Sequence, residues 1–254
     1  MVLSMDRWVG KVAVVTGTSA GIGYAIAEEL VKIGLIVAGL ARRKERTEEL
    51  SKKLSGEKGK LYALKCDVTK EEDILEAFKW VRENLGPVSI LVNNAGLAQD
   101  TTLIDGDITK WKTVIDTNVL GLCIATREAI KDMKANNIDG HIIHMNSLTG
   151  QKVVYVPVFN VYPATKFAVT ALAQTLRYEI NSQNLKIKIT SVSPGLVDTE
   201  IIQTDFGEVM NGKGVDLTCR LRSEDIADAV VYALSTPPHV QVSEVTVQPV
   251  GEIF

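Results

Sequence analysis

The sequence predicts an α/β fold in which a doubly wound, seven-stranded parallel sheet carries helices on both faces. Short apolar runs rich in β-branched residues recur along the chain without polar alternation, which is typical of strands covered on both sides. Between them lie longer segments whose apolar residues follow the helical period. The chain has 254 residues and no internal repeat, low-complexity tract or linker, so we expect a single domain over residues 1–254.

Composition and charge narrow the class of protein. Hydrophobic residues make up 46% of the chain, enough for a sizeable core, and the net charge of −3 gives no basic footprint for nucleic acid. The three cysteines lie far apart without a metal-ligand spacing, which favours reduced thiols and no metal site. The N-terminus lacks the apolar core of a signal peptide, and charged residues interrupt the apolar stretch from Val12 to Ala41. We therefore expect a cytoplasmic protein without a membrane span.

The first strand, predicted over Lys11 to Thr16, runs directly into a glycine-rich turn that opens a helix. Gly17, Gly21 and Gly23 leave room for a pyrophosphate against the backbone, and the helix presents free N–H groups to it. Their spacing is G-x-x-x-G-x-G. An ordinary tight turn is the alternative, although three glycines exceed what a turn requires. The context of strand, turn and helix favours a dinucleotide-binding loop.

The second strand is predicted over residues 35–40 and is followed by Arg42 and Arg43. No acidic residue lies between Val37 and Lys44, where one would bind the adenosine ribose hydroxyls and select NAD. An arginine can instead hold the 2′-phosphate of NADP in a bidentate contact. The alternative is a pair of solvated charges at the start of the next helix, where a cation meets the unfavourable end of the helix dipole.

The next elements repeat this alternation. A charged helix is expected over residues 44–55, and a third strand over 61–66 ends at Asp67 and Val68. A helix follows with a capping box of Thr69 and Glu72, and then a fourth strand over 88–92 that ends in Asn93-Asn94-Ala95-Gly96. Right-handed crossovers place the carboxyl ends of these strands at one edge of the sheet, where ligands of such folds bind.

A long helix is predicted to open at Asp107 or Thr109 and to run to about residue 136. Asn118 is a polar residue on its mostly apolar stripe. Buried amides need partners, and a satisfied core asparagine explains this residue about as well as a catalytic one.

A fifth strand over residues 140–145 leads to Ser147, at the same edge as the glycine loop. The segment from Lys152 to Phe159 is then unusually rich in Val, Tyr and Phe. Such a loop either packs beneath the next helix or lines a pocket for an apolar substrate.

Tyr162 and Lys166 lie four residues apart in a helix that is expected to begin after Asn160, its N-cap. Four residues are just over one turn, so both side chains leave the same face and can act on one small molecule. Alone, this spacing more often reflects a tyrosine packed under a solvated lysine. A sixth strand over 186–193 ends at Pro194-Gly195, and the poorly patterned stretch at about 198–222 predicts a lid over the site. A last helix and a seventh strand over 242–247 complete the chain.

Together these residues resemble the short-chain dehydrogenase/reductase family over nearly the whole chain. The motifs that carry the resemblance stand in the family's order: Thr16-Gly17-x-x-x-Gly21-x-Gly23, Asp67-Val68, Asn93-Asn94-Ala95-Gly96, Asn118, Ser147, Tyr162-x-x-x-Lys166 and Pro194-Gly195. The residues around Tyr162 look most like the insect farnesol dehydrogenase-like branch. One departure is the interval from Ser147 to Tyr162, which is longer than is common and holds the apolar loop.

The resemblance implies a catalytic set of Asn118, Ser147, Tyr162 and Lys166. Tyr162 would exchange the proton of the substrate hydroxyl, and Lys166 together with the positive cofactor ring would lower its pKa by stabilising the phenolate. Ser147 would donate a hydrogen bond to the substrate oxygen, and Asn118 would support a water chain. The expected substrate-binding residues are Ser147, Val153, Val154, Phe159 and Tyr162.

The resemblance also implies a set of contacts to NADP(H). They are Gly17, Ser19, Ala20, Gly21, Ile22 and Gly23 in the glycine loop, Arg42 and Arg43 at the 2′-phosphate, Asp67, Val68, Asn94, Ala95 and Gly96 on the adenosine side, and Tyr162, Lys166, Pro194, Gly195, Val197 and Thr199 on the nicotinamide side.

The function expected from this resemblance is that of an NADP(H)-dependent oxidoreductase interconverting a hydrophobic alcohol, such as farnesol or a related terpenoid alcohol, and its carbonyl. One alternative is a steroid, retinoid or general carbonyl reductase. Another is a non-catalytic NADPH-binding regulatory protein, because a fold does not fix a function. Family members pair through their two long central helices, so a homodimer or homotetramer is expected.

Overall fold

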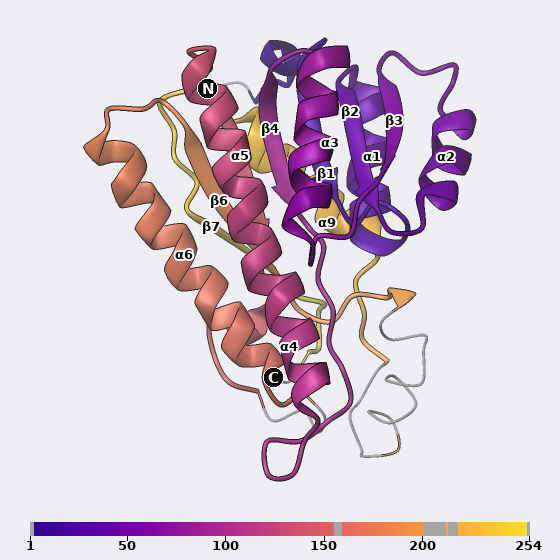
Figure 1. Cartoon of the computed structure of the whole chain (residues 1–254), viewed down its shortest axis with the longest axis vertical. Coiled ribbons are helices and arrows are strands. Elements are labelled where there is room, and N and C mark those ends of the chain that lie inside the picture. The colour runs from indigo at the N-terminus through magenta and orange to yellow at the C-terminus, as the bar shows by residue number, and fades with distance from the viewer. Residues whose placement is uncertain (1–2, 155–158, 201–211, 213–217, 253–254) are drawn as a thin grey trace.

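The computed structural model describes residues 3–154, 159–200, 212 and 218–252. Within these residues seven parallel strands form one sheet in the order β3-β2-β1-β4-β5-β6-β7. The chain winds outward in one direction from β1 to β3 and in the other from β4 to β7 (Figure 1). The doubly wound, Rossmann-type sheet predicted from the alternation of strands and helices is confirmed.

The strands are β1 (Val12–Thr16), β2 (Ile36–Ala41), β3 (Lys60–Lys65), β4 (Val88–Asn93), β5 (His141–Met145), β6 (Lys188–Pro194) and β7 (Glu244–Val247). The helices are α1 (Gly21–Ile33), α2 (Lys44–Lys53), α3 (Glu71–Asn84), α4 (Ile108–Ile115), α5 (Leu122–Ala135), α6 (Tyr162–Ser182) and α9 (Ser223–Ser235). Three short turns add η1 (Asp6–Trp8), the π-helical η2 (Asp116–Gly121) and η3 (Leu148–Gly150).

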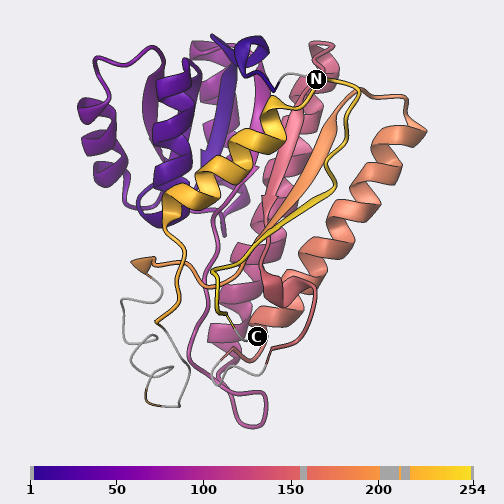
Figure 2. The same ribbon diagram turned by 180° about the vertical axis from the view of Figure 1, so that it is seen from behind.

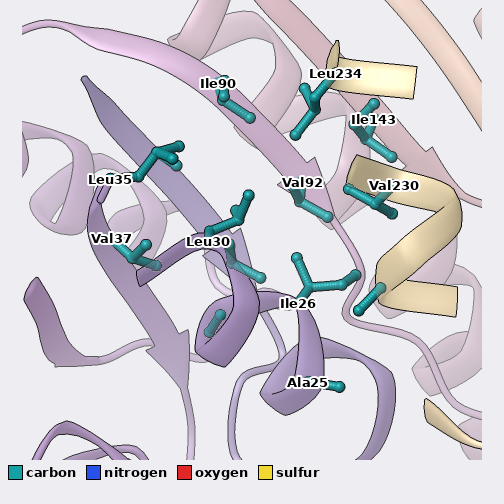
Figure 3. Packing of buried hydrophobic residues seen from close by; sticks show 14 of the residues in the cluster. Ala25, Ile26, Leu30, Leu35, Val37, Ile90, Val92, Ile143, Val230 and Leu234 are labelled. Carbon is teal, nitrogen blue, oxygen red and sulfur yellow. The ribbon is translucent and has the colours of Figure 1, made fainter. Parts of the chain in front are cut away.

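Helices cover both faces of the sheet. Helices α3, α5 and α6 lie on one face, and α1 and α9 lie on the other (Figures 1 and 2). On the second face Ile26 and Leu30 of α1 and Val230 of α9 pack over Ile90 and Val92 of β4 (Figure 3). Each such side chain contributes roughly 2 kcal/mol by leaving water. This two-sided burial explains why the strands read as continuous apolar runs.

Two local features near the strand ends differ from the sequence-based expectation. The prediction of a capping box at Thr69 and Glu72 is wrong. Helix α3 begins at Glu71, and its N-cap, Lys70, makes no capping side-chain bond. Asp67 Oδ1 instead accepts hydrogen bonds from Thr69 N at 3.1 Å and Thr69 Oγ1 at 2.8 Å. A turn centred on Asp67 therefore starts this connection, because a short carboxylate can bond its own backbone two residues on.

The predicted lid at about 198–222 falls mostly on residues 201–211 and 213–217, which lie outside the described residues. None of the described helices is long and apolar enough to cross a membrane.

Candidate active site

The turn between β1 and α1 is held in place by Asn94, which follows β4. Gly17 and Gly21 have φ angles of 76° and 58°, which favour glycine. Asn94 Nδ2 donates to the carbonyl oxygens of Thr16 at 2.8 Å and Gly17 at 3.2 Å. A Cβ on Gly23 would collide with this Asn94 amide and with the Gly17 carbonyl. Packing within the loop therefore requires the third glycine.

The first turn of α1 fits the pyrophosphate of a dinucleotide. Its N-cap, Ala20, makes no capping side-chain bond, so no side chain of the cap competes with an anion for the first N–H groups. A Cβ on Gly21 would lie 3.2 Å from Thr199 Cγ2, which brings the segment after β6 against the glycine loop. Ser19 and Ile22 border the same turn.

Arg43 lies beside the glycine loop at the end of β2. Its Nη2 donates to Ser19 Oγ at 3.3 Å and to Glu200 Oε2 at 2.6 Å. Both Arg42 and Arg43 are exposed to solvent. Of the two arginines predicted at the 2′-phosphate position, Arg43 is the one with a hydrogen bond to the loop.

The end of β4 joins the cofactor side of the site to the catalytic side. The N–H groups of Asn94 and Ala95 both donate to Thr16 Oγ1, at 3.0 and 2.9 Å. A Cβ on Gly96 would lie 3.5 Å from Asn118 Oδ1 and 3.7 Å from Lys166 Nζ. Residues expected on the adenosine side thus lead directly to two residues of the expected catalytic set.

Val68 packs against the π-helical turn. A Cβ on Gly121 would collide with the Val68 carbonyl and lie 3.1 Å from its Cβ. This contact fixes the segment after β3 against the turn that carries Asn118.

Asn118 lies in the π-helical turn, and the long helix predicted to run from about 107 to 136 is confirmed over 108–135 with this turn inside it. The turn η2 joins α4 to α5, and Ile115 and Leu122 on either side of it keep helical backbone angles. Asn118 Oδ1 accepts from Leu97 N at 2.9 Å, and its Nδ2 donates to Leu97 O at 3.0 Å and Thr165 Oγ1 at 3.1 Å. The buried amide is thus satisfied, and it fixes the segment after β4 against α6. Interruptions of this kind are frequent at functional sites.

Ser147, Tyr162 and Lys166 converge between the end of β5 and the start of α6. Ser147 lies near enough to Tyr162 for its hydroxyl to favour the phenolate and oppose the rise in the Tyr162 pKa. Lys166 is buried, its Nζ donates to the Met145 carbonyl at 2.9 Å, and it lies 5.6 Å from the centroid of the Tyr162 ring. Ser147 Oγ accepts from Thr149 N at 3.2 Å and Thr149 Oγ1 at 3.0 Å, so its own proton remains for another acceptor.

Burial controls the protonation of these groups in the protein alone. It raises the pKa of Tyr162 to about 12, against the opposing effect of the Ser147 hydrogen bond. Burial also lowers the pKa of Lys166 to about 8. The lowered Tyr162 pKa expected from the family is therefore not found without the cofactor, because withdrawal of the phenolate from water dominates. Burial and then the charge of Lys166 lower the pKa of the neighbouring His144 to about 3.

Asn160 is not the N-cap of α6, contrary to the sequence-based expectation. It adopts a positive φ of 38°, and the N-cap is Val161, which makes no capping side-chain bond. Asn160 Nδ2 donates to the Gln99 carbonyl at 2.8 Å, which joins the start of α6 to the segment after β4. Asparagine tolerates this left-handed conformation better than most residues.

The expected substrate residues of the apolar loop do not share one environment. The Phe159 ring centroid lies 5.1 Å from that of Tyr162. Val154 is half-buried, whereas Val153 is exposed. Residues 155–158 of this loop lie outside the described residues.

The segment after β6 is anchored by the C-terminal end of the chain. Gly195 N donates to the Val247 carbonyl at 2.8 Å, and Leu196 N donates to Glu252 Oε1 at 2.8 Å. Pro194 ends β6, and a Cβ on Gly195 would collide with the Glu252 carboxylate. Val197 is buried and forms an isolated bridge with Leu221.

Sequence reasoning missed several residues that build this site. Thr16 and Thr165 each bond a predicted site residue, and Arg46 and Glu200 form an ion-paired cluster with Arg43. A threonine that ends a buried strand immediately before a glycine loop was the available signal for Thr16. The pairing of Arg46 with Glu200 joins residues 154 positions apart, and periodicity carries no signal for it.

Comparison with known proteins identifies relatives along the whole chain. The short chain dehydrogenase family model matches residues 11–208. Farnesol dehydrogenase of Aedes aegypti is 50% identical and covers 98% of this chain and 100% of its own length. Dehydrogenase/reductase SDR family member 11 of Mus musculus is 45% identical over 98% of each chain.

Solved structures of similar fold also cover nearly the whole chain. An alcohol dehydrogenase from the archaeon Thermococcus sibiricus, complexed with 5-hydroxy-NADP, is 30% identical with a TM-score of 0.82 and covers 95% of this chain and 97% of its own. The closed form of a serine dehydrogenase complexed with NADP+ is 32% identical with a TM-score of 0.85 over 96% of each chain.

Proposed function

This chain belongs to the short-chain dehydrogenase/reductase family of NAD(P)-dependent oxidoreductases, and we propose that it uses NADP(H) to interconvert a hydrophobic alcohol and its carbonyl. The observation that carries the proposal is the convergence of Ser147, Tyr162 and Lys166, joined to the glycine loop through the end of β4. A tyrosine, a buried ammonium and a hydroxyl donor are the groups that alcohol–carbonyl exchange requires.

Tyr162 is the proposed proton donor and acceptor. Its pKa of about 12 keeps the phenol protonated at neutral pH in the cofactor-free protein, ready to protonate a carbonyl oxygen during reduction. In the oxidative direction Tyr162 Oη takes the hydroxyl proton, which requires nearby positive charge to stabilise the phenolate. Lys166 supplies such a charge, because a group with a pKa of about 8 is mostly protonated at neutral pH.

Ser147 is the proposed donor to the substrate oxygen. Its Oγ accepts two hydrogen bonds from Thr149, which orient the hydroxyl and leave its proton for the substrate or for Tyr162. Donors fixed in this way are worth about 3 kcal/mol when charge develops on an oxygen in the transition state. Asn118 is proposed as a positioning residue, because its amide holds Leu97 and Thr165 on either side of the site.

The proposed cofactor is NADP(H). The glycine loop and the first turn of α1 would hold its pyrophosphate, and Arg43 with Ser19 would hold the 2′-phosphate. When bound, the cofactor accepts or donates a hydride at its nicotinamide ring. Support for NADP over NAD comes from the absence of an acid between Val37 and Lys44, and from solved relatives described as NADP complexes.

The proposed substrate is farnesol or a related terpenoid alcohol. Support comes from the mosquito relative that is named farnesol dehydrogenase and is 50% identical over its full length. The Phe159 ring beside Tyr162 is consistent with an apolar substrate, because an aromatic side chain buries a large area of hydrocarbon.

A spectrophotometric screen of NADP(H) and NAD(H) against farnesol, steroids, retinoids and simple ketones tests the proposal. The wild-type enzyme should turn over farnesol with NADP, and Tyr162→Phe should lose at least a thousandfold in kcat/KM while binding NADPH normally. Tyr232→Phe is the matched control, because this tyrosine is 46% exposed on α9, away from the helices proposed to pair. Retained turnover in Tyr162→Phe contradicts the proton role, and exclusive use of another substrate class contradicts the terpenoid assignment.

We also propose that the enzyme is a homodimer or homotetramer. Five large apolar side chains are exposed on α4, η2 and α6: Ile108, Ile115, Leu120, Phe167 and Tyr178. Exposed apolar groups on long helices suit a contact between copies. Sedimentation of a monomer at micromolar concentration contradicts this assignment.

A further inference from the structure

The ion-paired cluster at the end of β2 contains an acid from a distant part of the chain. Arg43 Nη2 lies 2.6 Å from Glu200 Oε2, and Arg46 Nη1 bonds Glu200 Oε1. Glu200 thus uses both carboxylate oxygens, one for each guanidinium. The same Arg43 nitrogen donates to Ser19 Oγ at 3.3 Å, so the cluster lies directly beside the glycine loop.

The cluster joins two arginines to one carboxylate and is therefore more than a single surface ion pair. Its two guanidinium groups come from one end of α2, and the fully used carboxylate comes from the segment after β6. Partial burial pushes the pKa of Glu200 upward, but its hydrogen bonds to Arg43 and Arg46 outweigh this and hold it below the ordinary value. The carboxylate therefore stays ionised at neutral pH, and two positive charges face one negative charge.

Glu200 brings a carboxylate to Arg43, just after the end of β2, where the chain itself carries no acid. No Asp or Glu lies between Val37 and Lys44, where an acid would select NAD. A 2′-phosphate needs the same donors that Glu200 now holds, and it carries about −1.5 to −2 charge at pH 7, so it cannot share them with a carboxylate without strong repulsion.

We propose that Arg46 is a second residue for the 2′-phosphate beside Arg43, and that Glu200 is an internal anion that competes with this phosphate for both arginines. The proposal rests on the NADP(H) dependence proposed above and adds to it a specificity-determining carboxylate. NADP(H) must displace Glu200 to bind, whereas NAD(H), which has only a hydroxyl there, leaves it in place. Glu200 therefore weakens NADP(H) binding and narrows its advantage over NAD(H).

Isothermal titration with 2′,5′-ADP and 5′-AMP tests this without any turnover, because the two probes differ only by the 2′-phosphate. Glu200→Gln should raise the ratio of their affinities about fivefold, the upper range for an exposed ion pair. Arg46→Ala should lower the ratio about threefold or more. When Glu200→Gln is added to Arg46→Ala, the rise in the ratio should be smaller than in the wild type. High salt should shrink both changes, since the groups are partly exposed.

Glu83→Gln is the matched control. It removes the same charge and a 4.0 Å pair with Lys79 at the far end of α3, so its affinity ratio should equal that of the wild type. A ratio in Glu200→Gln within about twofold of this control overturns the competition. An unchanged ratio in Arg46→Ala overturns the second phosphate residue.

Failure of the proposed function gives a different result. If the wild type shows no preference for 2′,5′-ADP, the assigned NADP(H) dependence is contradicted. Glu200→Gln still tests the competition in that case. If this variant prefers 2′,5′-ADP over 5′-AMP, the Glu200 carboxylate masked the phosphate site and the competition is supported. If the variant shows no such preference, the competition is overturned.

Discussion

Replacing Lys166 by methionine should make the cofactor-free protein more stable at neutral pH while removing its activity. The Lys166 ammonium is buried at 6% exposure and donates a hydrogen bond to the Met145 carbonyl. Methionine has a similar length and no charge. The substitution therefore removes an ionised group that folding withdraws from water.

The magnitude follows from the pKa. A fall from 10.5 in the unfolded chain to about 8 in the folded protein means that the charged form costs about 3 kcal/mol below pH 8. Loss of the bond to the Met145 carbonyl offsets about 1 kcal/mol. The Lys166→Met variant should therefore be more stable than the wild type by about 2 kcal/mol at pH 7.

The sign of the pH dependence is fixed by the same pKa. Between pH 8 and 10.5 the folded wild type has released the Lys166 proton while the unfolded chain still holds it, so wild-type stability rises with pH. The advantage of the variant should fall by about 2 to 3 kcal/mol from pH 7 to pH 10 and change sign. Groups common to both proteins cancel in the difference.

Urea denaturation of both cofactor-free proteins, at one concentration and at several pH values, measures this difference. A variant that is less stable than the wild type at pH 7, or a difference that does not change with pH, would refute the argument that burial dominates the protonation of this site. Loss of activity in the same variant would indicate that the costly burial of this ammonium is kept for function.

Two further substitutions test the packing that holds the site. Gly23→Ala should weaken NADPH binding more than tenfold, because the new Cβ would collide with the Asn94 amide and the Gly17 carbonyl. Equilibrium fluorescence titration measures the affinity for NADPH. Gly56→Ala is the control, because a Cβ on Gly56 meets nothing within 4 Å. Asn118→Ala should lower the free energy of unfolding by about 3 kcal/mol, because it leaves the Leu97 N–H and carbonyl without the Asn118 amide. A loss below about 1 kcal/mol in urea denaturation would contradict the role of Asn118 in holding Leu97.

The doubly wound parallel sheet and its ligand edge could be predicted because they follow from local patterns. The five residues of β1 are all buried, and an uninterrupted apolar run such as Val12–Thr16 signals this directly. Gly17 and Gly21 take the left-handed backbone that a glycine-rich turn implies. The edge then follows from the right-handed crossover rule, without any knowledge of side-chain contacts.

The features that could not be predicted depend on contacts between distant segments. Asn160 resembles an N-cap in sequence, but its bond to the Gln99 carbonyl draws it into a left-handed conformation. The π-helical turn around Asn118 could not be recognised from the apolar pattern, because one extra residue in a single turn barely changes the helical period. The sequence gives no reason to prefer Arg42 or Arg43 as the phosphate residue. The hydrogen bonds of Arg43 to Ser19 and Glu200 distinguish the two in the folded chain.

Tyr162 also shows where sequence analogy stops. Proximity to Lys166 predicts a lowered pKa, yet burial raises it to about 12 in the protein alone. The balance between burial and charge depends on how much water reaches the phenol, and this is a property of the packed fold.

The central claim is that this site moves a hydride from an alcohol carbon while Tyr162 takes the hydroxyl proton. Farnesol carrying deuterium at its hydroxyl-bearing carbon, incubated with NADP+ and the wild-type enzyme, tests this most directly by mass spectrometry of the reduced cofactor. The account predicts deuterated NADPH and farnesal from the wild type and neither from Tyr162→Phe. NADPH without deuterium, or equal label transfer in Tyr162→Phe, would contradict it.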